Sequence, residues 1–256
     1  MQLNNVSFSY HQQAEIIHDI SADVTPGHIL SIVGPNGAGK TTLLKLMTGE
    51  LKPSRGAVML DGEPLSQLTR KQRADQIAIV SQQNQLYDDM KVIDVVKMGR
   101  LAKHGLLAAI DDQEVAPYLV MTGLQSFANR PMSQLSGGQK QRVWIAGAIA
   151  QDPQYLFLDE PTTYLDIRYQ TELMAIIEKL HRQQQMTIVM ILHDINQAFR
   201  MSDDIWLIKA GKLVSTGQPN QFYDERSLSE IFNTAIRIVS IPDYGKYIVE
   251  LPDGAN

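Results

Sequence analysis

The sequence predicts an α/β fold in which a mostly parallel sheet carries a phosphate-binding loop. The first observation is an apolar segment, residues 29–33, that runs directly into a glycine-rich loop. The second is a series of short apolar segments in the second half of the chain, separated by amphipathic helical stretches as in βαβ units. The third is a change to helical spacing after Gln82. Together they predict a core that is discontinuous in sequence and interrupted by a helical insert.

The glycine-rich loop matches the phosphate-binding pattern G-x-x-x-x-G-K-[ST] at every fixed position, from Gly34 to Thr41. Glycine permits the backbone angles that turn N–H groups inward around phosphates, and Gly34, Gly37 and Gly39 meet that need. We expect Lys40 to reach the β- and γ-phosphates and Thr41 to offer its hydroxyl to Mg²⁺. The helix that begins there would direct its positive dipole end at the anion. The chain is therefore predicted to bind a nucleoside triphosphate, against the alternative of a chance glycine-rich turn.

The first third of the chain has the period of half-buried strands. Val6, Phe8 and Tyr10 alternate with polar residues, and so do Val58 and Leu60. Alternation with period 2 places one side of each strand against a core. We therefore expect a sheet around the phosphate loop.

The stretch after Gln82 has the apolar spacing of helices. Its last helix is predicted to begin near Ser136 and to stop at Asp152, because the proline that follows disfavours helix in the residue before it. In the earlier helices, the apolar residues expected to share a side are Val92, Val95, Val96 and Met98 in one segment and Val115, Leu119 and Val120 in another.

Three short apolar segments follow this insert, at residues 154–158, 187–192 and 204–209. Amphipathic helices separate them, which predicts a parallel sheet covered by helices. Near the end, residues 236–241 and 247–251 flank a turn and predict a hairpin.

Two adjacent carboxylates, Asp159 and Glu160, come directly after the segment 154–158. Sheets of α/β proteins build their ligand sites at the carboxyl ends of strands. Asp159 is expected to hold Mg²⁺ directly or through water, and Glu160 to orient and polarise the attacking water as general base. The alternative is a solvated acidic turn.

A second candidate phosphate-binding helix start lies at Ser136-Gly-Gly-Gln139. A serine cap followed by glycine amides at a helix N-terminus offers an anion site without side-chain obstruction. Taken alone, the same residues also fit an ordinary loop and helix cap.

The composition is that of an ordinary globular protein, with 44% hydrophobic and 20% charged residues among 256. No apolar run approaches the roughly 20 residues that span a bilayer, so we expect any membrane role to depend on a partner. The first residues lack the pattern of a signal peptide and the sequence has no cysteine, which favours the cytoplasm. The net charge of −5 disfavours nucleic acid as a ligand.

With these motifs in this order, the sequence resembles the ATP-binding subunits of ABC transporters over essentially its whole length. The resemblance implies an α/β P-loop NTPase (RecA-like) core with an antiparallel β subdomain and an inserted α-helical subdomain. It places the nucleotide-binding core with its β subdomain at 1–82 and 154–256, and the α-helical subdomain with the signature motif at 83–153. The C-terminal hairpin is expected at 236–251, and the whole of 1–256 is expected to be a single ABC ATPase domain.

The resemblance also assigns roles to residues. Tyr10 matches the aromatic residue that stacks on adenine, Gln82 the glutamine that senses Mg²⁺ and the γ-phosphate, and His193 the switch histidine. Asp166 matches the aspartate of the loop between subunits. Tyr10 could instead only pack, and a histidine at a strand end is often a capping residue. The catalytic candidates are Lys40, Gln82, Glu160 and His193; the metal candidates are Thr41, Gln82 and Asp159; and the ATP-binding candidates are Tyr10, Gly34, Pro35, Asn36, Gly37, Ala38, Gly39, Lys40, Thr41, Thr42, Ser136, Gly137, Gly138, Gln139 and Asp166.

In this family the phosphate loop of one subunit and the signature loop of another enclose ATP, so the resemblance implies a homodimer with two composite ATP sites. It further implies two integral membrane permease subunits, an indirect periplasmic or lipid-anchored substrate-binding protein, and a place on the cytoplasmic face of the bacterial inner membrane. The segment from Gln83 to about Arg100 is expected to form the groove for a permease helix. Val92, Val95 and Val96 could equally be internal core.

Within the family, the sequence most resembles the ATPases of ferric siderophore importers, on residues 161–167 and 193–197 and on the terminal hairpin. Thr163-Tyr164 departs from the more general Ser-Ala. The predicted function is ATP hydrolysis that energises iron(III)-siderophore import. Haem and cobalamin importers use similar ATPases and stay open as alternatives. A soluble non-transport ATPase of the same superfamily and an adaptor that binds ATP without hydrolysing it are further alternatives.

Overall fold

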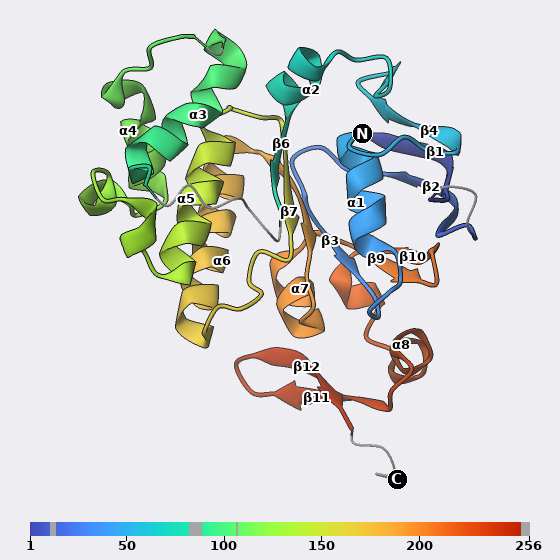
Figure 1. Ribbon diagram of the computed structural model, residues 1–256. Helices are drawn as coiled ribbons and strands as arrows, with labels where there is room; N and C mark the ends of the chain where they lie inside the picture. The colour runs from blue at the N-terminus through green and yellow to red at the C-terminus, as the bar shows by residue number, and fades with distance from the viewer. Residues whose placement is uncertain (11–13, 82–88, 106, 252–256) are drawn as a thin grey trace. The chain divides into compact units, whose positions relative to one another are not determined.

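The computed structural model describes residues 1–10, 14–81, 89–105 and 107–251. The chain forms two compact units, one made of Met1–Ser66 and Met190–Asn256 and the other of Gln67–Val189. Each unit combines strands and helices (Figure 1). The architecture is the mixed α/β fold that the sequence predicts.

The first unit contains the N-terminal strands and the C-terminal quarter of the chain. Its elements are β1 (Gln2–Phe8), β2 (Ile17–Asp23), β3 (Ile29–Val33), α1 (Lys40–Thr48), β4 (Arg55–Leu60), β5 (Glu63–Pro64), α7 (Ile195–Met201), β9 (Asp204–Lys209), β10 (Lys212–Gly217), the short 3-10 helix η3 (Pro219–Gln221), α8 (Glu225–Phe232), β11 (Ile236–Ile241) and β12 (Gly245–Glu250). β1 pairs antiparallel with β2 and β4, and β4 with β5. β9 pairs parallel with β3 and antiparallel with β10, while β11 and β12 form a hairpin.

The second unit contains most of the helices. Its elements are α2 (Arg70–Gln76), β6 (Ile77–Val80), α3 (Val92–His104), α4 (Asp112–Met121), η1 (Gln125–Phe127), η2 (Met132–Gln134), α5 (Gly137–Ile149), β7 (Tyr155–Asp159) and α6 (Ile167–Gln184). β6 and β7 pair parallel, and α3, α4 and α5 pack against one another. β8 (Thr187–Ile191) carries the chain from this unit back into the first.

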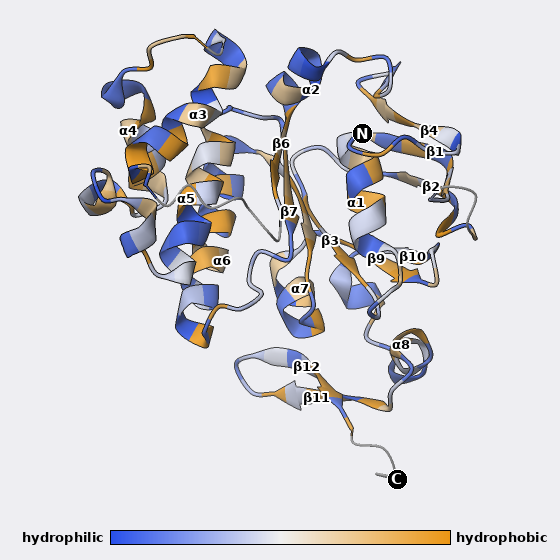
Figure 2. Cartoon of the chain, viewed as in Figure 1, coloured by the Kyte–Doolittle hydropathy of each residue, from blue (hydrophilic) through white to orange (hydrophobic). Residues whose placement is uncertain are grey.

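The inner strands are buried along their whole length. Every residue of β3, β7 and β8 is buried, as the continuous apolar runs of a covered sheet predict. β7 and β9 are accordingly coloured as largely hydrophobic (Figure 2). Of the helices in the described ranges, none is both long and apolar enough to cross a membrane.

Two apolar residues of the helical part lie on a different side from the one the sequence predicts. Met98 is 39% exposed and Val120 is 52% exposed. The buried stripe of α3 runs through Val92, Val95, Val96 and Gly99, so Met98 falls at its flank. On α4, Leu119 is buried four residues after the buried Val115, and Val120 lies on the next position around the helix.

Among the element boundaries that differ from the prediction, two concern Tyr10 and Asp152. β1 ends at Phe8, so Tyr10 lies beyond the strand that was expected to include it. α5 begins after Ser136 as predicted but ends at Ile149, before Asp152. Asp152 has a positive φ of 44°, a left-handed conformation that an α-helix cannot contain.

Candidate functional site

The phosphate loop connects β3 to α1, and its glycines are required for different reasons. A Cβ on Gly34 would lie 2.0 Å from the carbonyl oxygen of Ile208 on β9, so only glycine fits against that backbone. Gly39 combines a φ of +96° with a Cβ position 2.9 Å from the side chain of Ile17. Gly37 has a φ of +77° and open space around its Cβ position. The loop therefore lies against the backbone of β9 at Gly34 and against the side chain of Ile17 on β2 at Gly39, while Gly37 is needed for its backbone conformation.

Lys40 is the first residue of α1 and is only 6% exposed. Its Nζ donates hydrogen bonds to the carbonyl oxygens of Gly34 at 2.8 Å and Pro35 at 3.0 Å. These two carbonyls hold the ammonium group at the start of the loop. Thr41 and Thr42 follow in the first turn of α1, at the end of the helix where the dipole favours an anion.

His193 shares a pocket with the phosphate loop in the first unit. The pocket has a volume of about 270 Å³ and is lined by Gly34, Pro35, Asn36, His193, Ile195, Phe232, Ile236 and Glu250. His193 follows β8 and directly precedes Asp194, whose carboxylate caps α7. The structure thus brings two separate predicted site segments together, and adds walls from α8 and the terminal hairpin that the sequence did not predict.

Tyr10 is half-buried, and its ring meets that of Phe8 edge-on with the centroids 4.7 Å apart. This contact fits the packing role that the sequence left open. Stacking of Tyr10 on adenine stays a prediction. Gln82 lies outside the described residues, as does the start of the groove segment at Gln83. Within the described part of that segment, Val92, Val95 and Val96 are buried, so these three belong to the core of the helical part.

The two adjacent carboxylates lie at the end of β7 in the second unit. Asp159 is the last residue of the strand and is 7% exposed. Glu160 follows with a φ of +52°, a conformation that costs a non-glycine residue roughly 1–2 kcal/mol. Thr163 Oγ1 donates a hydrogen bond of 3.2 Å to Glu160 Oε2. The carboxylate of Glu160 is thus oriented by a neighbouring hydroxyl on a strained turn, an arrangement typical of functional sites.

The Ser136–Gln139 segment forms a capping box at the start of α5. Ser136 Oγ accepts from Gln139 N–H at 3.3 Å, and Gln139 Oε1 accepts from Ser136 N–H at 2.9 Å. A Cβ on Gly138 would lie 2.9 Å from the ring of Tyr169, so packing against α6 requires this glycine. Asp166 caps α6 by accepting from the N–H of Tyr169 at 3.1 Å. These contacts give Ser136, Gly138 and Asp166 structural roles beside the predicted nucleotide roles.

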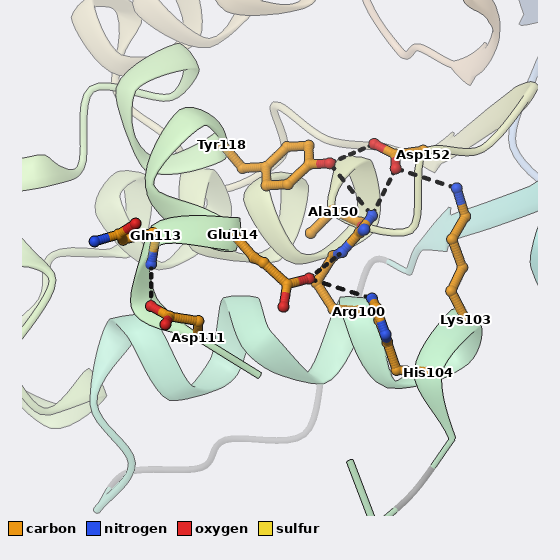
Figure 3. A network of polar contacts seen from close by, with 9 residues as sticks. All are labelled: Arg100, Lys103, His104, Asp111, Gln113, Glu114, Tyr118, Ala150 and Asp152. Carbon is orange, nitrogen blue, oxygen red and sulfur yellow. Dashed lines mark hydrogen bonds and ion pairs between the residues drawn. The ribbon is translucent and has the colours of Figure 1, made fainter. Parts of the chain in front are cut away.

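A polar network that the sequence did not predict joins the end of α3 to α4 and to the loop after α5 (Figure 3). The phenol of Tyr118 donates to Asp152 Oδ1, and Arg100 Nη1 and Lys103 Nζ donate to Asp152 Oδ2 at 2.6 Å and 3.1 Å. Burial and the contact with Asp152 raise the pKa of Tyr118 to about 12. Burial alone would raise the pKa of Asp152, but the hydrogen bonds from Tyr118, Lys103 and Arg100 outweigh it and lower that pKa.

Known proteins resemble this chain over most of its length. The chain is 36% identical over 248 residues to the petrobactin import ATP-binding protein FpuD of Bacillus anthracis, covering 96% of this chain and 90% of that protein. It is 35% identical over 234 residues to the iron(3+)-hydroxamate import ATP-binding protein FhuC of Bacillus subtilis, covering 90% and 87%. The solved dimeric cassette MJ0796, in a post-hydrolysis state bound to ADP and Pi, has a TM-score of 0.74 and 30% identity over 85% of this chain and 98% of that one.

A family model described as ABC transporter matches residues 17–163, a span that runs from β2 through the phosphate loop, the capped start of α5 and the carboxylates after β7. The chain therefore belongs to the ABC transporter family.

Proposed function

We propose that the chain is the ATP-hydrolysing subunit of an importer for iron(III)-siderophores. The observation that carries the ATPase part is the phosphate loop. Its first glycine, Gly34, lets the loop backbone lie against β9, and the buried ammonium group of Lys40 donates to two carbonyl oxygens of the loop. The cargo part rests on the relatives, two of which are named for import of petrobactin and of iron(3+)-hydroxamate.

In this proposal, the loop residues 34–42 bind the phosphates of ATP through backbone N–H groups and the Lys40 ammonium. Tyr10 stacks on adenine. The second phosphate contact comes from the Ser136–Gln139 segment of another copy, and Asp166 lies in the loop between the copies. The solved MJ0796 cassette is dimeric and bound to ADP and Pi, and 85% of this chain aligns with it, which supports a nucleotide-bound pair of copies.

Mg²⁺ suits the donor set that the chain offers. The hydroxyl of Thr41 and the carboxylate of Asp159 are hard oxygen donors of the kind that Mg²⁺ prefers, and Gln82 adds an amide oxygen. Asp159 presents its carboxylate at the end of a fully buried strand, which limits its freedom to move. When bound, the ion would neutralise charge on the β- and γ-phosphates.

Glu160 is proposed as the general base that orients and polarises the attacking water. Its carboxylate is already held by the hydroxyl of Thr163, which favours a single orientation. His193 is proposed to donate a hydrogen bond to the γ-phosphate and stabilise the charge that develops there. The pocket that His193 shares with Gly34, Pro35 and Asn36 supports this role.

The working assembly in this proposal has two copies of the chain and two permease subunits at the cytoplasmic face of the bacterial inner membrane, with a substrate-binding protein acting indirectly. Closure of the ATP-bound pair and its release after hydrolysis would drive transport. We propose a nucleotide-binding core with its β subdomain at 1–82 and 154–256, and an α-helical subdomain at 83–153 that passes the motion to the permeases.

The test is uptake of labelled ferric siderophores, haem and cobalamin by cells that lack the chain and carry either wild type or Glu160→Gln. Wild type alone should restore uptake of a ferric siderophore, because only it can complete hydrolysis. If haem or cobalamin uptake is restored instead, the assignment as a transport ATPase would stand and the assignment of iron(III)-siderophores as its cargo would be wrong. Equal restoration by Glu160→Gln would overturn the role of Glu160.

A further inference from the structure

The side chain of Asn196 on α7 pairs with the backbone of Ile248 on β12. Asn196 Nδ2 donates to the carbonyl oxygen of Ile248 at 2.9 Å, and the N–H of Ile248 donates to Asn196 Oδ1 at 2.7 Å. An amide side chain carries a donor and an acceptor next to each other, as a peptide unit does. The side chain of Asn196 therefore pairs with the edge of β12 as one residue of a neighbouring strand would. The hairpin is tied by two hydrogen bonds to the first turn of α7.

The same residue is tied through its backbone to the cap of α7. Asp194 Oδ1 accepts from the N–H of Asn196 at 2.8 Å and from the N–H of Gln197 at 3.2 Å. His193 is the residue directly before Asp194. Any displacement of β12 against α7 therefore acts on the cap, and through the cap on the backbone that carries His193.

Other contacts hold the hairpin in place on the first unit. Arg200, one turn further along α7, donates to the hydroxyl of Tyr244 at 3.2 Å. On the α8 side, the N–H of Ile238 donates to Glu225 Oε1 at 2.7 Å and the N–H of Ile236 donates to Ser229 Oγ at 2.9 Å. Figure 1 shows the hairpin beside α7 and following α8. The hairpin is thus a docked element with specific polar contacts.

The docked hairpin also borders the histidine pocket. Ile236 of β11 and Glu250 of β12 line it together with His193, and the two are cross-strand partners in the hairpin register. The side chain of Ile195, between the cap and Asn196, is buried and lines the same pocket. The hairpin is therefore connected to His193 through Asn196 and the α7 cap, and it also lines the same pocket as His193.

We propose that Asn196 is a positioning residue, which uses the docked β11–β12 hairpin as a fixed support to hold His193 toward the phosphate loop. The proposal rests on the proposed role of His193 in ATP hydrolysis. It makes the C-terminal hairpin part of the machinery that sets the rate of ATP turnover, although none of its residues belongs to the phosphate loop or to the carboxylate pair.

The first arm of the test reads the position of His193 without any turnover. Wild type, Asn196→Ala and Arg200→Ala are labelled with ¹³C-histidine, and the His193 ring resonance is assigned by its loss in His193→Gln. Asn196→Ala should shift that resonance, whereas Arg200→Ala, which loosens the hairpin only at its turn, should leave it in place. An unshifted resonance in Asn196→Ala, or an equal shift in Arg200→Ala, would overturn the assignment to Asn196.

The second arm measures Mg²⁺-ATP hydrolysis by the full chain. Asn196→Ala should lower kcat by between tenfold and 100-fold, roughly the loss that a small misplacement causes, while KM changes by less than about twofold. Because Asn196 acts through His193, Asn196→Ala should cost little more in a His193→Gln background. Equal losses in both backgrounds would overturn the positioning role. Absence of hydrolysis in wild type would instead contradict the proposed function, and the resonance shift would still decide the position of His193.

Discussion

Tyr118 on α4 and Asp152, in the loop after α5, are joined by a hydrogen bond from the phenol to the carboxylate. The same carboxylate accepts from Arg100 and Lys103 of α3, so one side chain connects two helices to a third chain segment. The side chain of Arg100 is mostly buried, and a buried charge destabilises the folded state when its partner is removed.

Replacing the carboxylate of Asp152 should lower the stability of the packing between α3, α4 and the loop after α5. Asp152→Asn removes the negative charge that faces Arg100 and Lys103; because the Asp152 side chain is 45% exposed and screened by water, we expect a loss of about 1 kcal/mol in the free energy of unfolding. Urea denaturation followed by circular dichroism measures it. Glu178→Gln, in an exposed pair with Arg182 on α6, is the matched control and should change stability by less than about 0.5 kcal/mol. Equal effects of the two substitutions would contradict a network that is partly shielded from water.

The raised pKa of Tyr118 predicts a loss of stability at alkaline pH. In the unfolded chain the phenol ionises near its usual pKa of 10, whereas in the folded chain it stays neutral up to about 12. The stabilisation is therefore complete below about pH 10 and is lost as the pH rises from about 10 to about 12. The measurement is the urea midpoint across this range. Since lysines also titrate there, the difference between wild type and Tyr118→Phe isolates the phenol, and a constant difference would argue against the raised pKa.

Two glycines at the contact between α3 and α5 should respond to alanine in opposite directions. A Cβ on Gly99 would lie 2.0 Å from the carbonyl oxygen of Gly147, whereas a Cβ on Gly147 meets only the carbonyl oxygen of Val95 at an ordinary 3.5 Å. Gly99→Ala should destabilise by at least about 1–3 kcal/mol through overpacking. Gly147→Ala should be neutral or stabilise by up to about 1 kcal/mol, because alanine favours helix. Thermal unfolding of the two variants checks this, and the reverse order would refute the close contact.

Removing the ammonium group of Lys40 should abolish productive ATP binding. The β- and γ-phosphates lose their point charge, and the carbonyl oxygens of Gly34 and Pro35 lose the donor that they share. Titration calorimetry of Lys40→Ala with Mg²⁺-ATP is the measurement. Lys45→Ala, on the same helix, is the control and should bind ATP like wild type. Near-normal affinity in Lys40→Ala would contradict the assignment of the loop.

The elements that the sequence predicts well are those specified by local patterns. The strand 29–33 and the helix start after Ser136 are confirmed, because burial of a continuous apolar run and a capping box are both encoded by neighbouring residues. The alternation predicts that Tyr10 continues the strand of Val6 and Phe8, which is wrong, because alternation cannot show where pairing with a neighbouring strand ends.

Contacts between distant segments could not be predicted from the sequence. The sequence indicates only a helix stop at Asp152, since nothing near it in sequence shows that Arg100 and Tyr118 lie beside it. Asn196 lies in the segment 193–197 that carries part of the resemblance, but nothing near it in sequence indicates that its side chain pairs with the backbone of Ile248. The sequence predicts the glycines of the phosphate loop because a loop around phosphates must turn its N–H groups inward. At Gly34 the structure adds a second reason, since the carbonyl oxygen of Ile208 leaves no room for a side chain.

The close approach of Gly34 to the carbonyl of Ile208 bears on how nucleotide affinity arises. A loop whose first residue touches the backbone of a buried strand is ordered when the sheet forms, and its other end packs at Gly39 against the side chain of Ile17. Nucleotide binding then needs little further loss of conformational entropy at the loop, so more of the phosphate contact energy appears as affinity. Residues on β9 that never meet ATP can accordingly be as important for its capture as those that do.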